Sequence, residues 1–148
     1  MRIALSADHA GYQLKDELVA WLREAGHDVQ DLGTNGPDSV DYPQFGTKLA
    51  EAVAQGDAER GIVVCGSGIG ISIAVNRNPG CRCARVSEPL SAALAREHND
   101  ANVLALGGRL IGGDMARACV AAFLGTDFAG GRHQPRVDQL SQELQDSD

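Results

Sequence analysis

The sequence has little basic charge, no long apolar run and no paired cysteine spacing. Lys and Arg number 13 against 20 Asp and Glu, so the 148-residue chain carries a net charge of -7. This balance argues against a nucleic-acid partner or a basic membrane face, and any anionic ligand must be bound by a local cluster. No apolar segment approaches a membrane span, and Met1–Leu5 leads at once to Asp8 and His9 rather than into a signal peptide. We therefore expect a cytoplasmic protein.

The four cysteines also lack the two-residue paired spacing of a zinc site. Cys81 and Cys83 alternate as residues of a strand do, and cysteine is usually buried, which favours structural thiols over metal or redox roles. We expect no metal and no cofactor. The chain shows no internal repeat, low-complexity segment or linker, and its length suits one domain over residues 1–148.

Short strand-like apolar segments alternate with longer segments of helical period. This alternation predicts an α/β fold, a three-layer αβα sandwich around a five-stranded parallel sheet. The predicted strands are 2–6, 27–32, 61–64, 81–86 and 102–106, and the main helices are about 11–24, 43–55, 69–76, 88–97 and 111–124.

Two of the predicted helices carry further expectations. In the first, Leu14, Leu18 and Leu22 form an apolar stripe, and Lys15 is expected to face solvent. A closing helix near the end of the chain has few apolar residues, chiefly Val137 and Leu140. A helix so poor in apolar residues seldom stands alone, so we expect it to pack on a partner subunit.

The segment 61–76, GIVVCGSGIGISIAVN, is the centre of the sequence. A buried strand ends at Cys65, and small residues follow before a helix begins. Small residues let several backbone N–H groups converge, and the helix adds its positive end, so the loop suits an anion. The same helix end favours the thiolate form of Cys65. A buried structural cysteine and a nucleotide-binding loop remain alternatives, although the dinucleotide fingerprint is poorly met because the loop follows the third strand.

Two further strand ends carry polar groups, and ligands of open parallel sheets bind beyond the carboxyl ends of the strands. Asp8 and His9 follow the first strand, and Arg109 follows the fifth. An acid and base pair there could hold a hydroxyl, bind a phosphate or move a proton. The simpler alternative is that Asp8 caps the next helix, but capping does not explain His9.

Cationic groups also lie beyond two helices. His98 and Asn99 end one helix, which they could merely cap, and Arg132, His133 and Arg136 precede the last. Three cationic or potentially cationic groups within five residues of an acidic protein indicate a phosphate site more than a solvated patch.

These groups together suit a sugar phosphate. Cations would hold the phosphate, a thiolate would remove the proton next to a carbonyl, and the N–H groups would stabilise the enediolate oxygen. A cyclic sugar must open first, which calls for a separate acid and base pair.

The chain resembles the type B ribose-5-phosphate isomerases, within the ribose and galactose sugar-phosphate isomerase family. The resemblance runs through IALSADHAGYQLK, DYP, GIVVCGSGIGISIAVN, SEPLSAALAREHNDANVLALGGRLIG and GGRHQPRV, in family order over nearly the whole chain. It implies a Rossmann-like fold, no cofactor, interconversion of ribose 5-phosphate and ribulose 5-phosphate, and homodimers, sometimes paired into tetramers, whose active sites use both subunits.

The resemblance also implies a role for each matching residue. Cys65 would be the base, Ser67 would assist proton transfer between the oxygens, and Asp8 with His98 would open the ring. The remaining matches are substrate-contacting positions or belong to the anion hole: His9, Tyr42, Gly66, Gly68, Ile69, Gly70, Asn99, Arg109, Arg132 and Arg136.

Other functions stay open on the sequence alone. Relatives act on six-carbon sugar phosphates such as allose 6-phosphate and galactose 6-phosphate, and a non-catalytic phosphosugar or nucleotide-binding module would use the glycine loop for binding only. A phospho-acceptor signalling domain is disfavoured, because it needs an aspartate where Cys65 stands.

Overall fold

The computed structural model describes residues 1–141, and it confirms the predicted αβα sandwich. Five parallel strands pair in the order β2-β1-β3-β5-β4. The strands are β1 Arg2–Ala7, β2 Asp28–Asp31, β3 Arg60–Cys65, β4 Cys83–Arg85 and β5 Val103–Gly107. The helices are α1 Tyr12–Glu24, α2 Tyr42–Ala54, α3 Ile69–Asn76, α4 Pro89–Asn99, α5 Gly113–Gly125 and α6 Gln134–Leu140, the last preceded by a 3-10 turn at Gly131–His133.

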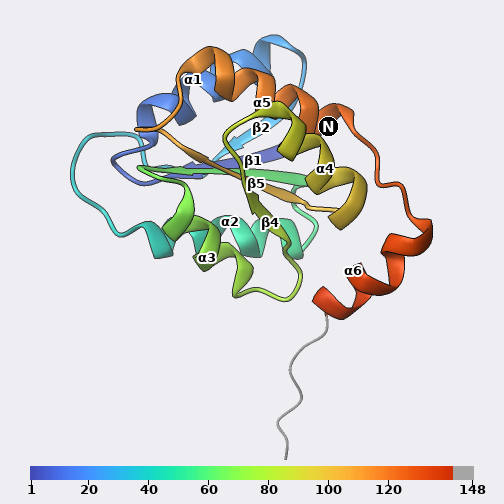
Figure 1. Ribbon diagram of the computed structural model, residues 1–148. Helices are drawn as coiled ribbons and strands as arrows, with labels where there is room; N and C mark the ends of the chain where they lie inside the picture. The colour runs from blue at the N-terminus through green and yellow to red at the C-terminus, as the bar shows by residue number, and fades with distance from the viewer. Residues whose placement is uncertain (142–148) are drawn as a thin grey trace, which may run out of the picture.

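The sheet is covered on both faces (Figure 1). Helices α1, α4 and α5 lie over one face, and α2 and α3 lie over the other. Alternate residues of a strand point to opposite faces, so Ile62 and Val64 join the first core while Val63 and Cys65 join the second. The side chain of Cys65 therefore lies on the α2 and α3 side, at the carboxyl end of the central strand.

The expectation that Lys15 faces solvent is wrong. Its side chain is fully buried, and its Nζ lies 2.6 Å from Asp31 Oδ1, 2.8 Å from Asp16 Oδ1 and 2.9 Å from Asn35 Oδ1. The helical period already contained the signal, because Lys15 precedes Leu18 by three residues and Val19 by four, which puts it on the buried face. The buried ammonium ties α1 to the end of β2 through Asp31 and to the loop that follows it through Asn35.

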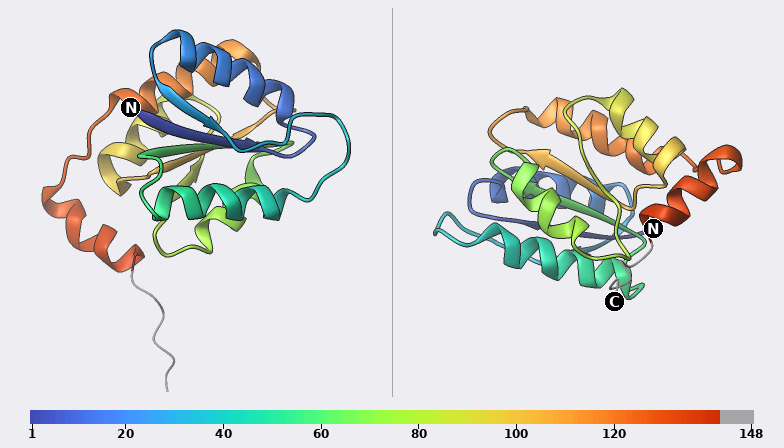
Figure 2. Two further views of the ribbon diagram at one scale, coloured as in Figure 1. Left: turned by 180° about the vertical axis from the view of Figure 1, so that it is seen from behind. Right: turned by 60° about the horizontal axis from the view of Figure 1, so that its bottom comes forward.

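The end of the described chain is attached to the domain although α6 stands apart from the sandwich (Figures 1 and 2). Val137 is buried, and an Arg82 Nη atom donates to Ser141 Oγ at 2.8 Å. Leu140 stays exposed. Packing of this helix on a partner subunit remains a prediction. Within residues 1–141, the helices all fall short of the length and apolar character that crossing a membrane requires.

Candidate active site

A cleft of about 630 Å³ opens at the carboxyl ends of β1, β3 and β5. This is the edge at which the sequence predicts a site, because polar residues follow all three strands there. Nine of the predicted site residues line the cleft, together with Ala10 and Leu110: Asp8, His9, Tyr42, Cys65, Gly66, Ser67, Ile69, Gly70 and Arg109.

Cys65 lies at the base of the cleft. Its side chain is 4% exposed, and its Sγ accepts a hydrogen bond from the backbone N–H of Gly68 at 3.1 Å. A donor that points at sulfur stabilises the thiolate more than the thiol. The arrangement therefore places a thiol that is shielded from solvent at the border of the cleft.

The turn from β3 to α3 depends on glycine. Gly68 has φ of 77°, and a Cβ there would lie 2.8 Å from the carbonyl carbon of Leu106. Only glycine fits both the left-handed backbone and the close approach to β5. This conformation is what aims the Gly68 N–H at Cys65.

The N–H groups of this turn divide into two sets. Those of Gly68 and Ile69 are already used, by Cys65 Sγ and by Ser67 Oγ at 3.1 Å. Among the hydrogen bonds of residues 1–141, none uses the N–H groups of Gly66 and Ser67, and Gly70 lies in the first turn of α3, which lacks intrahelical acceptors. A ligand oxygen would thus meet Gly66, Ser67 and Gly70.

Asp8 and His9 are oriented by backbone groups. Asp8 is 6% exposed, and its Oδ1 accepts from the N–H groups of Ala10 at 3.0 Å and Gly11 at 3.1 Å. Asp8 therefore shapes the loop before α1, although the N-cap itself is Gly11 without a side-chain cap. His9 Nδ1 accepts from the N–H of Val40 at 3.1 Å, so the neutral ring carries its proton on Nε2. Sequence reasoning missed Val40 because a backbone donor in a loop leaves no side-chain signature.

Tyr42 and Arg109 form parts of the cleft wall. A Cβ on Gly70 would lie 2.7 Å from the Tyr42 ring, so the ring packs directly on that glycine. The side chain of Arg109 passes over Gly66, and its backbone N–H donates to Gly66 O at 3.0 Å. Arg109 is exposed, so its guanidinium can meet a phosphate at the rim.

The other predicted cations form a second cluster, away from the cleft. His98 and His133 stack with ring centroids 4.5 Å apart and planes 15° apart. Arg132 and Arg136 flank His133 in sequence, both exposed, and an Arg136 Nη atom donates to Arg132 O at 3.5 Å. The structure therefore brings His98, Arg132 and Arg136 together, but not to Cys65.

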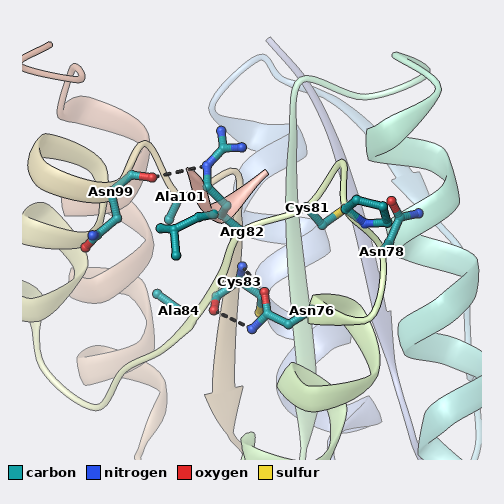
Figure 3. Close-up of a pocket in the computed structure, with 10 residues that line it drawn as sticks. Asn76, Asn78, Cys81, Arg82, Cys83, Ala84, Asn99 and Ala101 are labelled. Carbon is teal, nitrogen blue, oxygen red and sulfur yellow. Dashed lines mark hydrogen bonds between the residues drawn. The ribbon is translucent and has the colours of Figure 1, made fainter. Parts of the chain in front are cut away.

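Asn99 also lies outside the cleft. It borders a separate cavity of about 400 Å³ near β4 (Figure 3). Its backbone oxygen accepts from Arg82 Nε at 3.1 Å, while Asn76 and Cys83 exchange two hydrogen bonds across the same cavity.

The topology explains this separation. In a parallel sheet each helix runs back toward the amino ends of the strands. Helix α4 therefore ends, at His98 and Asn99, beside the start of β5, whereas Cys65 lies at the end of β3. The two groups of predicted residues occupy opposite edges of one domain.

In residues 1–141, no three His, Cys, Asp or Glu side chains lie close enough together to hold a metal ion. The side-chain polar groups of the cleft are one thiol, one carboxylate, one imidazole, one guanidinium and the hydroxyls of Tyr42 and Ser67, which with the backbone N–H groups suit proton transfer and oxyanion binding.

Comparison with known proteins extends over nearly the whole chain. The family model described as Ribose/Galactose Isomerase matches residues 3–140. The chain is 48% identical over 140 residues to ribose-5-phosphate isomerase B of Escherichia coli, covering 95% of this chain and 94% of that protein.

Solved structures agree with this match. The fold is similar to that of ribose-5-phosphate isomerase B from Clostridium thermocellum, with a TM-score of 0.94, 50% identity and 95% of each chain covered. It is also similar to ribose-5-phosphate isomerase B of Mycoplasma genitalium, solved with bound ribulose 5-phosphate, with a TM-score of 0.91 and 38% identity, covering 95% of this chain and 93% of that one.

Proposed function

Because this chain belongs to the ribose/galactose isomerase family, we propose that it interconverts D-ribose 5-phosphate and D-ribulose 5-phosphate. The observation that carries the proposal is the Cys65 thiol, which receives the Gly68 N–H at the base of a cleft bordered by unused backbone donors. Relatives named for this reaction, at up to 50% identity, support the choice of substrate.

Cys65 is the base of the proposed reaction. Its thiolate takes the proton from C2 of the open aldose, the C–H electrons form the C1–C2 double bond, and O1 becomes an oxyanion. The N–H groups of Gly66, Ser67 and Gly70 stabilise that charge. The Cys65 thiol then returns its proton to C1, which completes the ketose once the O2 proton has moved to O1.

Ser67 carries the proton between the two oxygens. Its Oγ already accepts the Ile69 N–H, so its own hydrogen is free to donate to a substrate oxygen. Ser67 lines the same cleft as Cys65, which is the placement that this relay requires.

The other predicted residues bind the remainder of the substrate or open its ring. His9 and Arg109 bind the phosphate from the cleft side, and Tyr42 contacts the sugar. Asp8 and His98 open the furanose ring before the proton is removed. His98, Asn99, Arg132 and Arg136 come from a second copy of the chain, because in one copy they lie at the opposite edge of the sheet.

Exposed apolar residues on two helices support this pairing. Ile69 and Ile73 on α3 are 51% and 60% exposed, and Leu90 and Leu94 on α4 are 67% and 37% exposed. Each pair is spaced by one helical turn, and the two helices flank the edge strand β4. We propose that these four residues contribute to the interface of a homodimer, and that two dimers can pair into a tetramer.

The first test is exchange of the substrate C2 proton. Cys65→Ala should abolish incorporation of solvent deuterium at C2 of ribose 5-phosphate, measured by mass spectrometry, while phosphate-dependent binding is retained. Cys119→Ala, which removes a buried thiol from α5, is the matched control and should keep exchange. If Cys65→Ala exchanges the C2 proton as fast as the wild type, Cys65 is not the base.

A second experiment identifies the sugar. The family description names both ribose and galactose, so phosphorylated aldoses of five and six carbons should be ranked by kcat/KM. The proposal predicts that ribose 5-phosphate ranks first. A higher kcat/KM for allose 6-phosphate or galactose 6-phosphate would identify a different substrate for the same isomerase chemistry. The absence of turnover of every aldose would favour a non-catalytic binding module.

A further inference from the structure

The stack of His98 on His133 joins two elements that are distant in sequence. The rings are nearly parallel, at 15°, with centroids 4.5 Å apart. His98 lies in the last turn of α4, and His133 ends the 3-10 turn that leads into α6. A contact between facing rings restricts the plane of each ring.

The segment that carries His133 is anchored to the end of α4. The backbone N–H of Ala129 donates to Glu97 O at 3.0 Å, and Arg96 Nε donates to Thr126 O at 3.2 Å. Beyond the stack, Val137 of α6 is buried. The chain is therefore attached to the domain both before and after His133, and these contacts keep His133 next to His98 independently of the two imidazoles.

The surroundings of His133 affect its pKa. Desolvation lowers the pKa of His133, and the positive charges of Arg132, His98 and Arg136 lower it further, against a smaller opposite effect of Glu97. His133 therefore tends to stay neutral near physiological pH. A neutral ring can face His98 whether His98 is protonated or not.

We propose that His133 is a positioning residue for His98: its ring holds the His98 imidazole in the orientation that opens the cyclic sugar. The inference rests on the proposed function, in which His98 belongs to the acid and base pair of ring opening. A role that acts only through His98 predicts that the effect of His133 is confined to the cyclic substrate.

The chemistry of the two substrates allows a selective test. Ribose 5-phosphate is mainly a furanose and must open, whereas ribulose 5-phosphate is open because its O5, which would close the ring, carries the phosphate. Deuterium entry at C1 of ribulose 5-phosphate thus reports enediolate formation without ring opening. The initial rate from ribose 5-phosphate reports both steps.

His133→Ala should lower kcat/KM for ribose 5-phosphate by about tenfold or more, a part of what a general acid or base typically contributes. Deuterium entry into ribulose 5-phosphate should stay within about twofold of the wild-type rate, because Cys65 and the phosphate site are intact. His133→Phe keeps a flat ring without the nitrogens and should retain most of the ribose 5-phosphate activity. His133→Leu fills the space without a flat ring and should behave like alanine.

Gln134→Ala is the matched control, because the Gln134 side chain is exposed and donates along α6 to Asp138 Oδ1. It should leave both rates unchanged. Unchanged turnover of ribose 5-phosphate in His133→Ala, or equal losses in both reactions, would overturn the inference. A wild-type protein that turns over neither sugar would instead refute the proposed function, so the two failures are distinguishable.

Discussion

Cys65 differs from the other three cysteines in what surrounds its sulfur. Burial raises the pKa of Cys81 to about 11, with Arg82 acting in the opposite direction. Burial, and then Cys81, raise the pKa of Cys83, and burial followed by Glu88 raises that of Cys119. These three thiols stay protonated at neutral pH, which fits the structural role expected for Cys81 and Cys83. Cys65 instead accepts a backbone N–H and borders the cleft.

The contrast predicts selective alkylation. At mildly alkaline pH, iodoacetamide should modify Cys65 well before the other cysteines, because the thiolate is the reactive form. Peptide mass spectrometry of a time course measures the order, and ribose 5-phosphate in excess should protect Cys65. Earlier modification of Cys81 or Cys83 would contradict this assignment of reactive and inert thiols.

Residues at strand ends are predictable from the sequence, whereas residues acting through long-range contacts are not. Asp8, His9 and Cys65 follow apolar runs directly, so their common edge follows from parallel pairing. The charge of Lys15 predicts a solvent-facing side chain, although the helical period places it on the buried face. Its distant partners Asp31 and Asn35 show how the buried ammonium is accommodated. The stack on His98 joins residues 35 positions apart by number, and nothing in the local sequence marks it.

At the scale of elements, the turn between β3 and α3 determines the geometry of the cleft. Gly68 must adopt positive φ and approach Leu106 closely, and its N–H then reaches Cys65. Gly26 has φ of 91°, but no atom lies within 4 Å of the point that a Cβ would occupy. Gly26 therefore shares the backbone requirement without the crowding.

This pair of glycines separates the two effects. Gly26→Ala should reduce the free energy of unfolding by about 1 kcal/mol, the cost of a left-handed alanine. Gly68→Ala should lose at least about 2 kcal/mol, because the new Cβ also meets the backbone of β5. Urea denaturation measures both. Gly68→Ala should in addition lower kcat, and equal stability with full activity would show that the turn tolerates a side chain.

Element boundaries show where the sequence is informative. The first, third and fifth strands are predicted to within one residue at each end, because apolar runs bounded by polar or glycine residues mark them. The fourth is predicted as 81–86 but pairs only over Cys83–Arg85. Asn102 Oδ1 accepts the Arg82 N–H, and Asn78 O accepts the Cys81 N–H, so these two N–H groups bond to partners other than the β5 backbone.

For the whole molecule, the main feature is that one copy holds the predicted site residues in two separate groups. Cys65, Asp8 and His9 line the cleft, whereas His98 stacks on His133 at the opposite edge of the sheet. The resemblance to a dimeric family leads to the expectation of a shared site, and the topology supplies a physical reason for it. The positions of these residues in the sequence do not reveal that they form two separate groups, because their separation depends on the direction of α4.

Mixing two inactive variants tests this account most directly. Cys65→Ala and His98→Ala each damage every site of their own homodimer, but a mixed dimer contains one site with an intact Cys65 from one copy and an intact His98 from the other. After unfolding and refolding together in equal amounts, ribose 5-phosphate isomerase activity should return to about one quarter of the wild-type value. Activity no greater than the average of the two separate variants would contradict a site built from two copies.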